Sequence, residues 1–103
     1  MNMKIKISNK ARDQIKEISQ YIAEDSVYYA KKTANEIYDK IYSLETGINL
    51  GRKVPELDDD VIRELLYKSY RIIFEIIENE VSVANIIQVF HGSRDFSKTY
   101  KIQ

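Results

Sequence analysis

Two helices in the first half of the chain are predicted by apolar residues that recur every three or four positions. Ser8 precedes the first stripe and Ser26 the second, where a side-chain oxygen can accept a hydrogen bond from an unpaired helical N–H. Gly47 follows the second stripe, and glycine ends helices in a left-handed conformation without strain. The apolar positions are Ala11, Ile15, Ile18 and Ile22 in the first stripe and Ala30, Ala34, Ile37, Ile41 and Leu44 in the second. Because the joint between the helices is very short, they are expected to pack antiparallel.

Strands are predicted on both sides of this helical region. Residues 3–7 alternate Met or Ile with Lys, which is typical of a half-buried strand. After a loop that contains glycine, proline and an acidic run, three segments rich in β-branched and aromatic residues follow at 61–67, 70–78 and 81–91. The predicted fold is α+β, with an N-terminal strand and two antiparallel helices packed on one face of a twisted antiparallel sheet of about four strands. Since no repeat or linker divides the chain, residues 1–103 are expected to form one domain.

The last two strands are predicted to form a hairpin around a two-residue loop, Asn79-Glu80. One face of this hairpin is almost wholly apolar and is expected to receive the helices. That face carries Tyr70, Ile72, Phe74 and Ile76 opposite Val89, Ile87, Asn85 and Val83. The other face carries Arg71, Ile73, Glu75 and Ile77 opposite Gln88, Ile86, Ala84 and Ser82.

The second face of the hairpin contains enough apolar residues to form a connected patch. The residues of this patch are Ile73, Ile86, Ile77 and Phe90. A patch of this kind on a small domain indicates a partner, unless residues 91–103 fold back and cover it. The two faces of the strand at 61–67 have equal apolar content, because Val61, Arg63 and Leu65 on one face match Ile62, Glu64 and Leu66 on the other. Either set can therefore face the helices.

Composition excludes several classes of function. The chain has 16 Lys and Arg against 16 Asp and Glu, so it lacks the basic excess of a typical nucleic-acid-binding protein. Its lack of cysteine and its single histidine exclude disulfides, thiolate sites and structural zinc, and no metal or cofactor is expected. No apolar run approaches the roughly 20 residues of a membrane span. No signal peptide opens the sequence, and a cytoplasmic location is expected.

One group of candidate functional residues is expected at one end of the hairpin. In antiparallel pairing the start of 70–78 lies beside the end of 81–91, which brings Arg71 near His91 and Arg94. Two guanidiniums close together can hold a phosphodiester.

RNA cleavage by the RNA's own 2′-hydroxyl is the reaction that this group suggests. The reaction needs positive charge on the phosphoryl oxygens, a base for the 2′-proton and an acid for the leaving oxygen. The candidates are Arg71 and Arg94 for the phosphate, His91 or Tyr100 as acid, Glu56 or Glu64 as base, and Arg52, Arg63 and Lys98 as further substrate contacts. Purely structural roles are the alternative, with Arg71 paired to Glu75, Arg94 paired to Asp95 and His91 at the boundary of the core.

Four short motifs follow one another in a characteristic order. They are Gly-Arg-Lys-Val-Pro-Glu-Leu at 51–57, Ile-Arg-Glu-Leu at 62–65, Tyr-Arg-Ile-Ile-Phe at 70–74 and His-Gly-Ser-Arg-Asp at 91–95. Over roughly residues 3–100, this order resembles the RelE/ParE superfamily of toxins from type II toxin–antitoxin systems. The resemblance implies two antiparallel helices on a twisted sheet. It also implies a cognate antitoxin that covers the open sheet face, and a heterotetramer with this antitoxin is a further expectation.

The superfamily contains two kinds of toxin, and the residues of this chain divide between them. RelE-like members cut mRNA in the ribosomal A site, whereas ParE-like members poison DNA gyrase without cutting nucleic acid. Arg71 matches a RelE-type arginine that faces the scissile phosphate, and Arg94 and Tyr100 match the spacing of two functional residues near the RelE C-terminus. Ile62 and Glu64, however, stand about where RelE-type enzymes carry a lysine pair.

Glu56 and His91 loosely resemble the acid–base pair of other RNA-cleaving relatives. The motifs around them also read like ParE-type and plasmid-stabilisation sequences. The sequence therefore predicts a growth-inhibiting toxin that cuts mRNA on the ribosome. The alternatives are a gyrase poison that acts by protein binding and an inactive module that only binds antitoxin.

Overall fold

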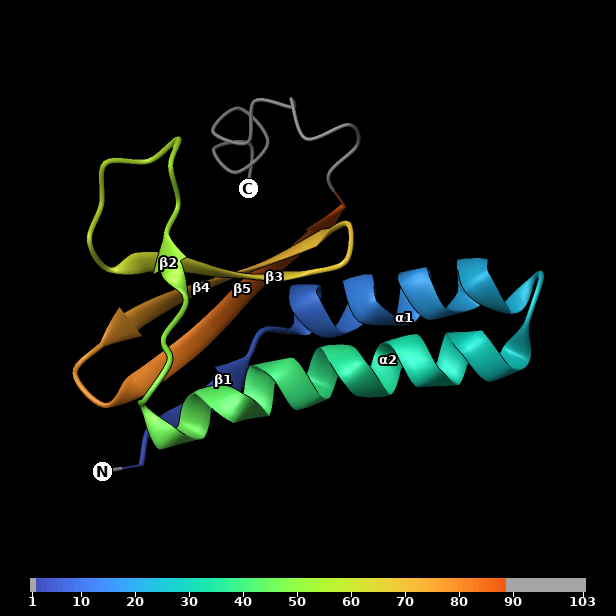
Figure 1. The fold of residues 1–103 in the computed structure, drawn as a ribbon, viewed down its shortest axis with the longest axis horizontal. Coiled ribbons are helices and arrows are strands. Elements are labelled where there is room, and N and C mark those ends of the chain that lie inside the picture. The colour runs from blue at the N-terminus through green and yellow to red at the C-terminus, as the bar shows by residue number, and fades with distance from the viewer. Residues whose placement is uncertain (1, 89–103) are drawn as a thin grey trace.

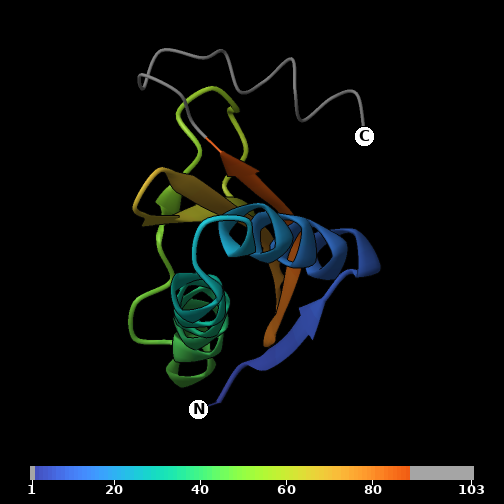
Figure 2. The same ribbon diagram turned by 90° about the vertical axis from the view of Figure 1, so that its right-hand side faces the viewer.

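Residues 2–88 are described by a computed structural model, in which two helices cover one face of a twisted five-stranded sheet (Figures 1 and 2). The elements are β1 (Lys4–Ile7), α1 (Asn9–Ala23), α2 (Val27–Tyr42), the short 3₁₀ helix η1 (Ser43–Thr46), β2 (Arg52–Lys53), β3 (Ile62–Tyr67), β4 (Tyr70–Ile77) and β5 (Glu80–Gln88). The strand order is β1-β5-β4-β3-β2, and β1 is parallel to β5 while the other pairs are antiparallel.

The predicted α+β class is confirmed, with two differences in the sheet. There are five strands instead of about four, because the two-residue β2 is too short to show a period. The N-terminal strand is parallel to its neighbour, so the sheet is mixed. Parallel neighbours need a long crossover, and the helices and strands between β1 and β5 supply it.

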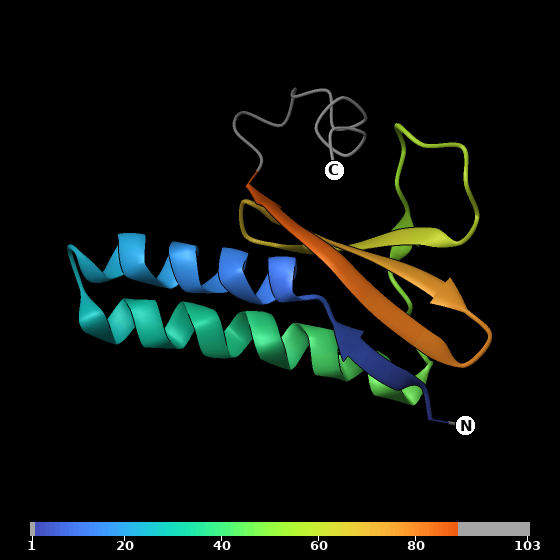
Figure 3. The same ribbon diagram turned by 180° about the vertical axis from the view of Figure 1, so that it is seen from behind.

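Both predicted helices are confirmed together with their capping residues. Ser8 Oγ accepts a hydrogen bond from the Ala11 N–H at 2.9 Å, and Ser26 Oγ accepts one from the Tyr29 N–H at 3.2 Å. The α-helical geometry ends at Tyr42, and the chain then continues through η1 to Gly47, whose φ of +70° ends the helical region as predicted. The two helices lie antiparallel and side by side (Figure 3). Within residues 2–88, neither helix is long and apolar enough to cross a membrane.

The helix-facing side of β4 also agrees with the prediction. Ile72 and Phe74 are fully buried in the main core, and Tyr70 and Ile76 pack against its margin. The rest of this core includes Ala11, Ile15, Ile37, Ile41, Leu44, Val81 and Val83. The apolar stripes of both helices therefore meet the apolar face of the sheet, which removes the largest apolar area of the described chain from water.

The predicted register of the hairpin is wrong. Ile77 pairs with Glu80, so the two loop residues are Glu78 and Asn79, one position earlier than expected. This displacement changes the pairing of β4 with β5 by two residues, which leaves the faces of the strands as predicted, but an irregularity between the pairs of Ile73 and Phe74 then changes it by one residue. A shift of one residue exchanges the two faces of a strand. For that reason Ile86 packs in the core beneath the helices, while Ile87 lies on the opposite side, the reverse of the prediction.

The face of the sheet away from the helices, called here the open face, is partly covered by the chain itself. Val54 of the loop 54–61 is fully buried against Ile62 and Ile73, with Leu57 and Ile87 at the margin. The predicted exposed patch is therefore wrong for Ile73, which the loop covers, and for Ile86, which faces the helices. Ile77 is exposed as predicted. Phe90 and the segment 91–103 lie outside the described residues.

The cover formed by this loop also decides the orientation of β3. Ile62 and Glu64 point to the open face, while Leu65 and Tyr67 pack on the side of the helices. The Tyr67 hydroxyl donates a hydrogen bond to the Glu36 carboxylate and so links β3 to α2. Burial, reinforced by this bond, raises the pKa of Tyr67 to about 12.

Stability is expected to fall as the pH rises from about 10 to about 12, partly because of Tyr67. The unfolded chain releases the tyrosine proton near the ordinary pKa of 10.0, whereas the folded protein keeps it until about 12. In that window the folded state binds more protons, and an increase in pH therefore favours unfolding, by about 2–3 kcal/mol for a shift of this size. Urea unfolding of wild type and Tyr67→Phe between about pH 9 and 12 measures this contribution. Tyr42→Phe, at an exposed tyrosine, is the control and should keep the wild-type slope. A Tyr67→Phe variant that also kept this slope would contradict the assignment.

Candidate functional site

A network of four charged side chains lies on the open face where β2, β3, β4 and the loop 54–61 meet. Arg71 donates from Nε to Glu64 Oε1 at 2.6 Å, and its two terminal nitrogens donate to both carboxylate oxygens of Glu56 at 2.8 Å. The second oxygen of Glu64 accepts a hydrogen bond from Arg52 Nε at 2.6 Å. The side chain of Glu64 is 0% exposed and that of Arg71 is 9% exposed. This chain of contacts, called here the arginine–glutamate network, joins three strands to one loop.

The strand register explains why these side chains meet. Arg52 lies directly opposite Glu64 in the pairing of β2 with β3. Arg71 lies opposite Leu66 in the pairing of β3 with β4, two positions along from Glu64, so the two side chains are diagonal neighbours on one face. Glu56 reaches them from the loop, where Val54 and Leu57 anchor the chain on the sheet.

The electrostatics of the network are balanced. Among residues 2–88, two guanidiniums face two carboxylates in this network, and their formal charges sum to zero. The hydrogen bonds from Arg71 to Glu56 raise the pKa of Arg71. Burial opposes this, and the hydrogen bond to Glu64 adds to the increase. The guanidinium therefore stays charged. Three of its five N–H donors are directed at these carboxylates, so an incoming phosphate can gain the bidentate contact only by displacing Glu56.

The structure brings together four of the residues predicted for the site, Arg52, Glu56, Glu64 and Arg71. Arg71 and Glu56 are in direct contact, and Arg52 joins them through Glu64. Arg63 lies on the other side of β3, opposite Phe74, and its Nε donates to the Asp60 carbonyl at 3.3 Å.

The remaining predicted residues, His91, Arg94, Lys98 and Tyr100, lie outside the described residues. Their meeting with Arg71 therefore remains a prediction. The structural alternative predicted that Arg71 pairs with Glu75. This partner is wrong, since Arg71 forms ion pairs with Glu56 and Glu64. Within residues 2–88, no group of three or more histidine and carboxylate side chains is arranged to hold a metal ion.

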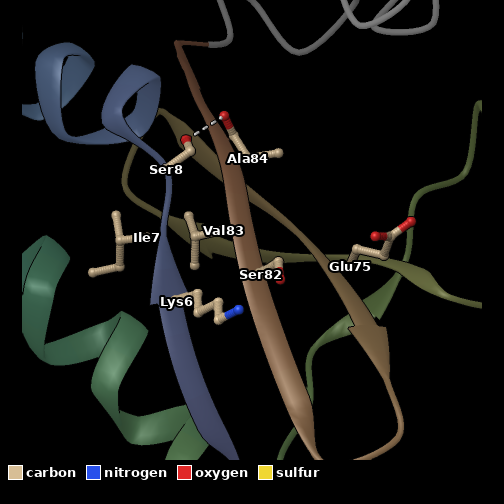
Figure 4. Close-up of a pocket in the computed structure, with 7 residues that line it drawn as sticks. All are labelled: Lys6, Ile7, Ser8, Glu75, Ser82, Val83 and Ala84. Carbon is tan, nitrogen blue, oxygen red and sulfur yellow. Dashed lines mark hydrogen bonds between the residues drawn. The ribbon is translucent and has the colours of Figure 1, made fainter.

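A shallow depression lies beside β1 on the sheet, and none of its lining residues belongs to the loop 54–61 (Figure 4). It has a volume of about 360 Å³, and Lys6, Ser82 and Glu75 line it from three adjacent strands. Ser8, at the end of β1, donates from Oγ to the Ala84 carbonyl at 3.2 Å. Lys6 Nζ lies 3.5 Å from a Glu80 carboxylate oxygen. The depression thus offers one cation, Lys6, and one carboxylate, Glu75, to a bound segment.

Gly51, directly before β2, adopts a left-handed conformation and lies close to the backbone of β3. Its φ is +69°, and a Cβ atom at this position would lie 2.2 Å from the Glu64 carbonyl oxygen. We expect Gly51→Ala to lower the free energy of unfolding by roughly 2 kcal/mol or more, because a left-handed alanine is strained by about 1–2 kcal/mol and this clash adds to the strain.

Thermal unfolding compares Gly51→Ala with Gly47→Ala, where φ is also positive. The free energy of unfolding of the Gly47 variant should fall only by the strain of a left-handed alanine, about 1–2 kcal/mol. Equal losses in the two variants would show that the close approach to Glu64 is unimportant.

Comparison with known proteins agrees with this architecture. The family model of the ParE toxin of type II toxin–antitoxin system, parDE, matches residues 5–96. A solved structure from P. aeruginosa, described as a chromosomal ParDE toxin–antitoxin system, is similar with a TM-score of 0.70 and 21% sequence identity. The match covers 85% of this chain and 97% of that chain, and it supports the fold. No curated protein sequence matches this chain significantly.

The expected membership of the RelE/ParE superfamily is confirmed, since the family match extends from β1 to beyond the last described strand. The chain belongs to the ParE toxin family of type II toxin–antitoxin systems.

Proposed function

We propose that this protein inhibits growth by binding a protein target, and that DNA gyrase is this target. Membership of the ParE family supports the proposal, because gyrase poisoning is what the resemblance to ParE-like toxins implies. We also propose a cytoplasmic location, where a gyrase-directed toxin would meet its target. The observation that carries the proposal over mRNA cleavage is the state of Arg71, whose guanidinium is held by two carboxylates.

Cleavage of RNA requires uncompensated positive charge at the scissile phosphate. In the arginine–glutamate network the charge of Arg71 is compensated, and Glu64 is entirely buried beside it. Moving the guanidinium to a phosphate would leave the buried Glu64 carboxylate with the 58% exposed Arg52 in place of two cationic partners, which costs several kcal/mol. A contact with a protein target makes no such demand on Arg71.

A cognate antitoxin is proposed as the second partner. The similar ParDE structure is described as a toxin–antitoxin system, and the part of the open face along β1 and β5 is not covered by the loop 54–61. Lys6, Glu75 and the exposed Ile77 give this surface mixed charge and apolar area for a bound segment. A heterotetramer of two toxins and two antitoxins is the assembly that we expect.

Inducing the gene without its neighbour tests the target. We expect DNA double-strand breaks and an SOS response, together with binding of the purified protein to purified gyrase. mRNA cut within codons, without DNA damage, would instead establish the ribosome-dependent mechanism. Normal growth would instead support the third alternative, an inactive module that only binds antitoxin.

mRNA cleavage is kept as the second candidate, because Glu56 and Arg71 are two of its predicted residues and lie in contact. Glu56→Gln separates the mechanisms. If Glu56 is a general base, the amide should reduce cleavage by about 10²–10⁴-fold. Under the proposed function, growth inhibition should remain near that of wild type, since the amide oxygen still accepts a hydrogen bond from Arg71. Growth assays and mapping of mRNA ends check this, with Glu75→Gln as a control outside the network.

A further inference from the structure

Four of the exposed large apolar residues belong to the helical turns on either side of the joint between α1 and α2. Tyr21 is 75% exposed, Val27 61%, Tyr28 68% and Tyr29 57%. They come from the last turn of α1 and the first turn of α2. The joint projects beyond the sheet at the far end of the helices (Figures 1 and 3). We call these four residues the tyrosine tip.

The tyrosine tip contributes little to the folding of the helices. The helical hairpin buries Ala30 and half-buries Ile18 and Ile22 near the joint, so its inward positions are already filled by other residues. The Tyr28 and Tyr29 rings contact each other edge to face with centroids 5.2 Å apart, which orders the two side chains without burying them. An ordered group of exposed aromatic residues on a small protein marks an interaction surface.

A second copy of this chain is a poor occupant for this surface. The exposed fractions of the three tyrosines amount to two whole side chains, or roughly 400 Å² per copy. Two copies in contact would bury roughly 800 Å² through these rings, which is below the ~1,200 Å² of a stable interface. The tip is convex, so a concave partner surface that also covers its flanks can bury more area.

A nucleic acid is also disfavoured by the charges beside the rings. Lys31 and Lys32 follow Tyr28 and Tyr29, but Glu24 and Asp25 lie in the joint itself, and all four side chains are exposed. Their formal charges cancel, whereas binding of a phosphate backbone needs a cationic surface. The joint is thus acidic and the following turn of α2 is basic, a mixture that a folded protein with a complementary rim can match.

We infer that the tyrosine tip is the surface through which this toxin docks on its protein target. The partner would present an apolar pocket for the tyrosines, with carboxylates facing Lys31 and Lys32 and cations facing Glu24 and Asp25. This inference rests on the proposed function as a protein-binding toxin. Because the tip lies away from the open face, an antitoxin bound along β1 and β5 leaves it exposed.

The test replaces the three tyrosines together, as Tyr21→Gln, Tyr28→Gln and Tyr29→Gln. Glutamine is polar and favours helices, so α1 and α2 should persist. Tyr42→Gln is the matched control, since Tyr42 is a 44% exposed tyrosine at the other end of α2. We expect the triple variant to bind purified gyrase about 100-fold more weakly, because buried aromatic anchors dominate binding at protein interfaces. Growth inhibition should fall in parallel, while antitoxin binding and the melting temperature match those of the control.

Two outcomes would overturn the inference. One is growth inhibition by the triple variant equal to that of wild type at equal protein level. The other is binding of a single-stranded oligonucleotide that the triple variant loses, which would assign the tip to nucleic acid. If wild type does not bind gyrase, the proposed target is wrong, but the growth assay still tests whether the tip serves the true target.

Discussion

Replacing Arg71 by methionine is expected to lower the free energy of unfolding by about 3–5 kcal/mol. The substitution leaves Glu64, which is 0% exposed, facing Arg52 alone, and it removes the bidentate bond that ties Glu56 to the sheet. Burying a carboxylate without a full partner is among the largest penalties that a single substitution can cause. Urea unfolding followed by circular dichroism measures the loss.

Two further variants show whether this loss comes from the buried charge. Arg52→Met removes a guanidinium from the same carboxylate, but the Arg52 side chain is 58% exposed, so the loss should be at most about 1 kcal/mol. Combining Arg71→Met with Glu64→Met removes both buried charges and should recover most of the stability. If Arg71→Met cost no more than Arg52→Met, the arginine–glutamate network would not organise this face.

The expected instability affects how toxicity assays of Arg71 variants are interpreted. A destabilised toxin disappears from the cell because its unfolded fraction is degraded, and growth then recovers whatever the mechanism. Loss of toxicity in an Arg71 variant therefore identifies a functional residue only if the amount of folded protein is unchanged. Glu56→Gln is the more informative substitution, because it keeps an acceptor beside the guanidinium.

The helices were predictable because their signals are local. The apolar spacing that places Ala11 and Ile15 in the core, and the serines that cap each helix, all act within a few residues along the chain. The α+β class followed from the same local patterns. The two-residue β2 had no pattern of its own and depends on its pairing with β3.

The open face was predicted less well because contacts distant in sequence decide it. The two alternating sets of β3 were equally apolar, and the choice between them depends on Val54 covering Ile62 and on Arg71 pairing with Glu64. Likewise, the irregularity in β5 reverses Ile86 and Ile87 although both are equally apolar. Glu56 and Arg71 were both selected as candidates, but no periodicity relates a loop residue to a strand residue, so their contact was not predictable.

The second large loss of stability is expected from a substitution on the side of the sheet that faces the helices. Phe74 is the largest side chain that is fully buried in residues 2–88, and it lies in the core between the sheet and both helices. We expect Phe74→Ala to lower the free energy of unfolding by about 3–5 kcal/mol, because the lost ring leaves a cavity that a β-strand held on both sides cannot close. The melting temperature should fall by roughly 15–30 °C.

Ile72→Val is the control for Phe74→Ala, since Ile72 is equally buried two positions away on the same strand face and loses only one methylene. Its cost should be about 0.5–1.5 kcal/mol. A small domain is stable by about 5–15 kcal/mol in total, so Phe74→Ala should remove a large fraction of this stability whereas Ile72→Val should not. Near-equal melting temperatures for the two variants would show that the helices do not close over Phe74. The helix-facing core and the arginine–glutamate network lie on opposite sides of β4. A substitution that disrupts one of them therefore leaves only the other to hold this strand in the folded state.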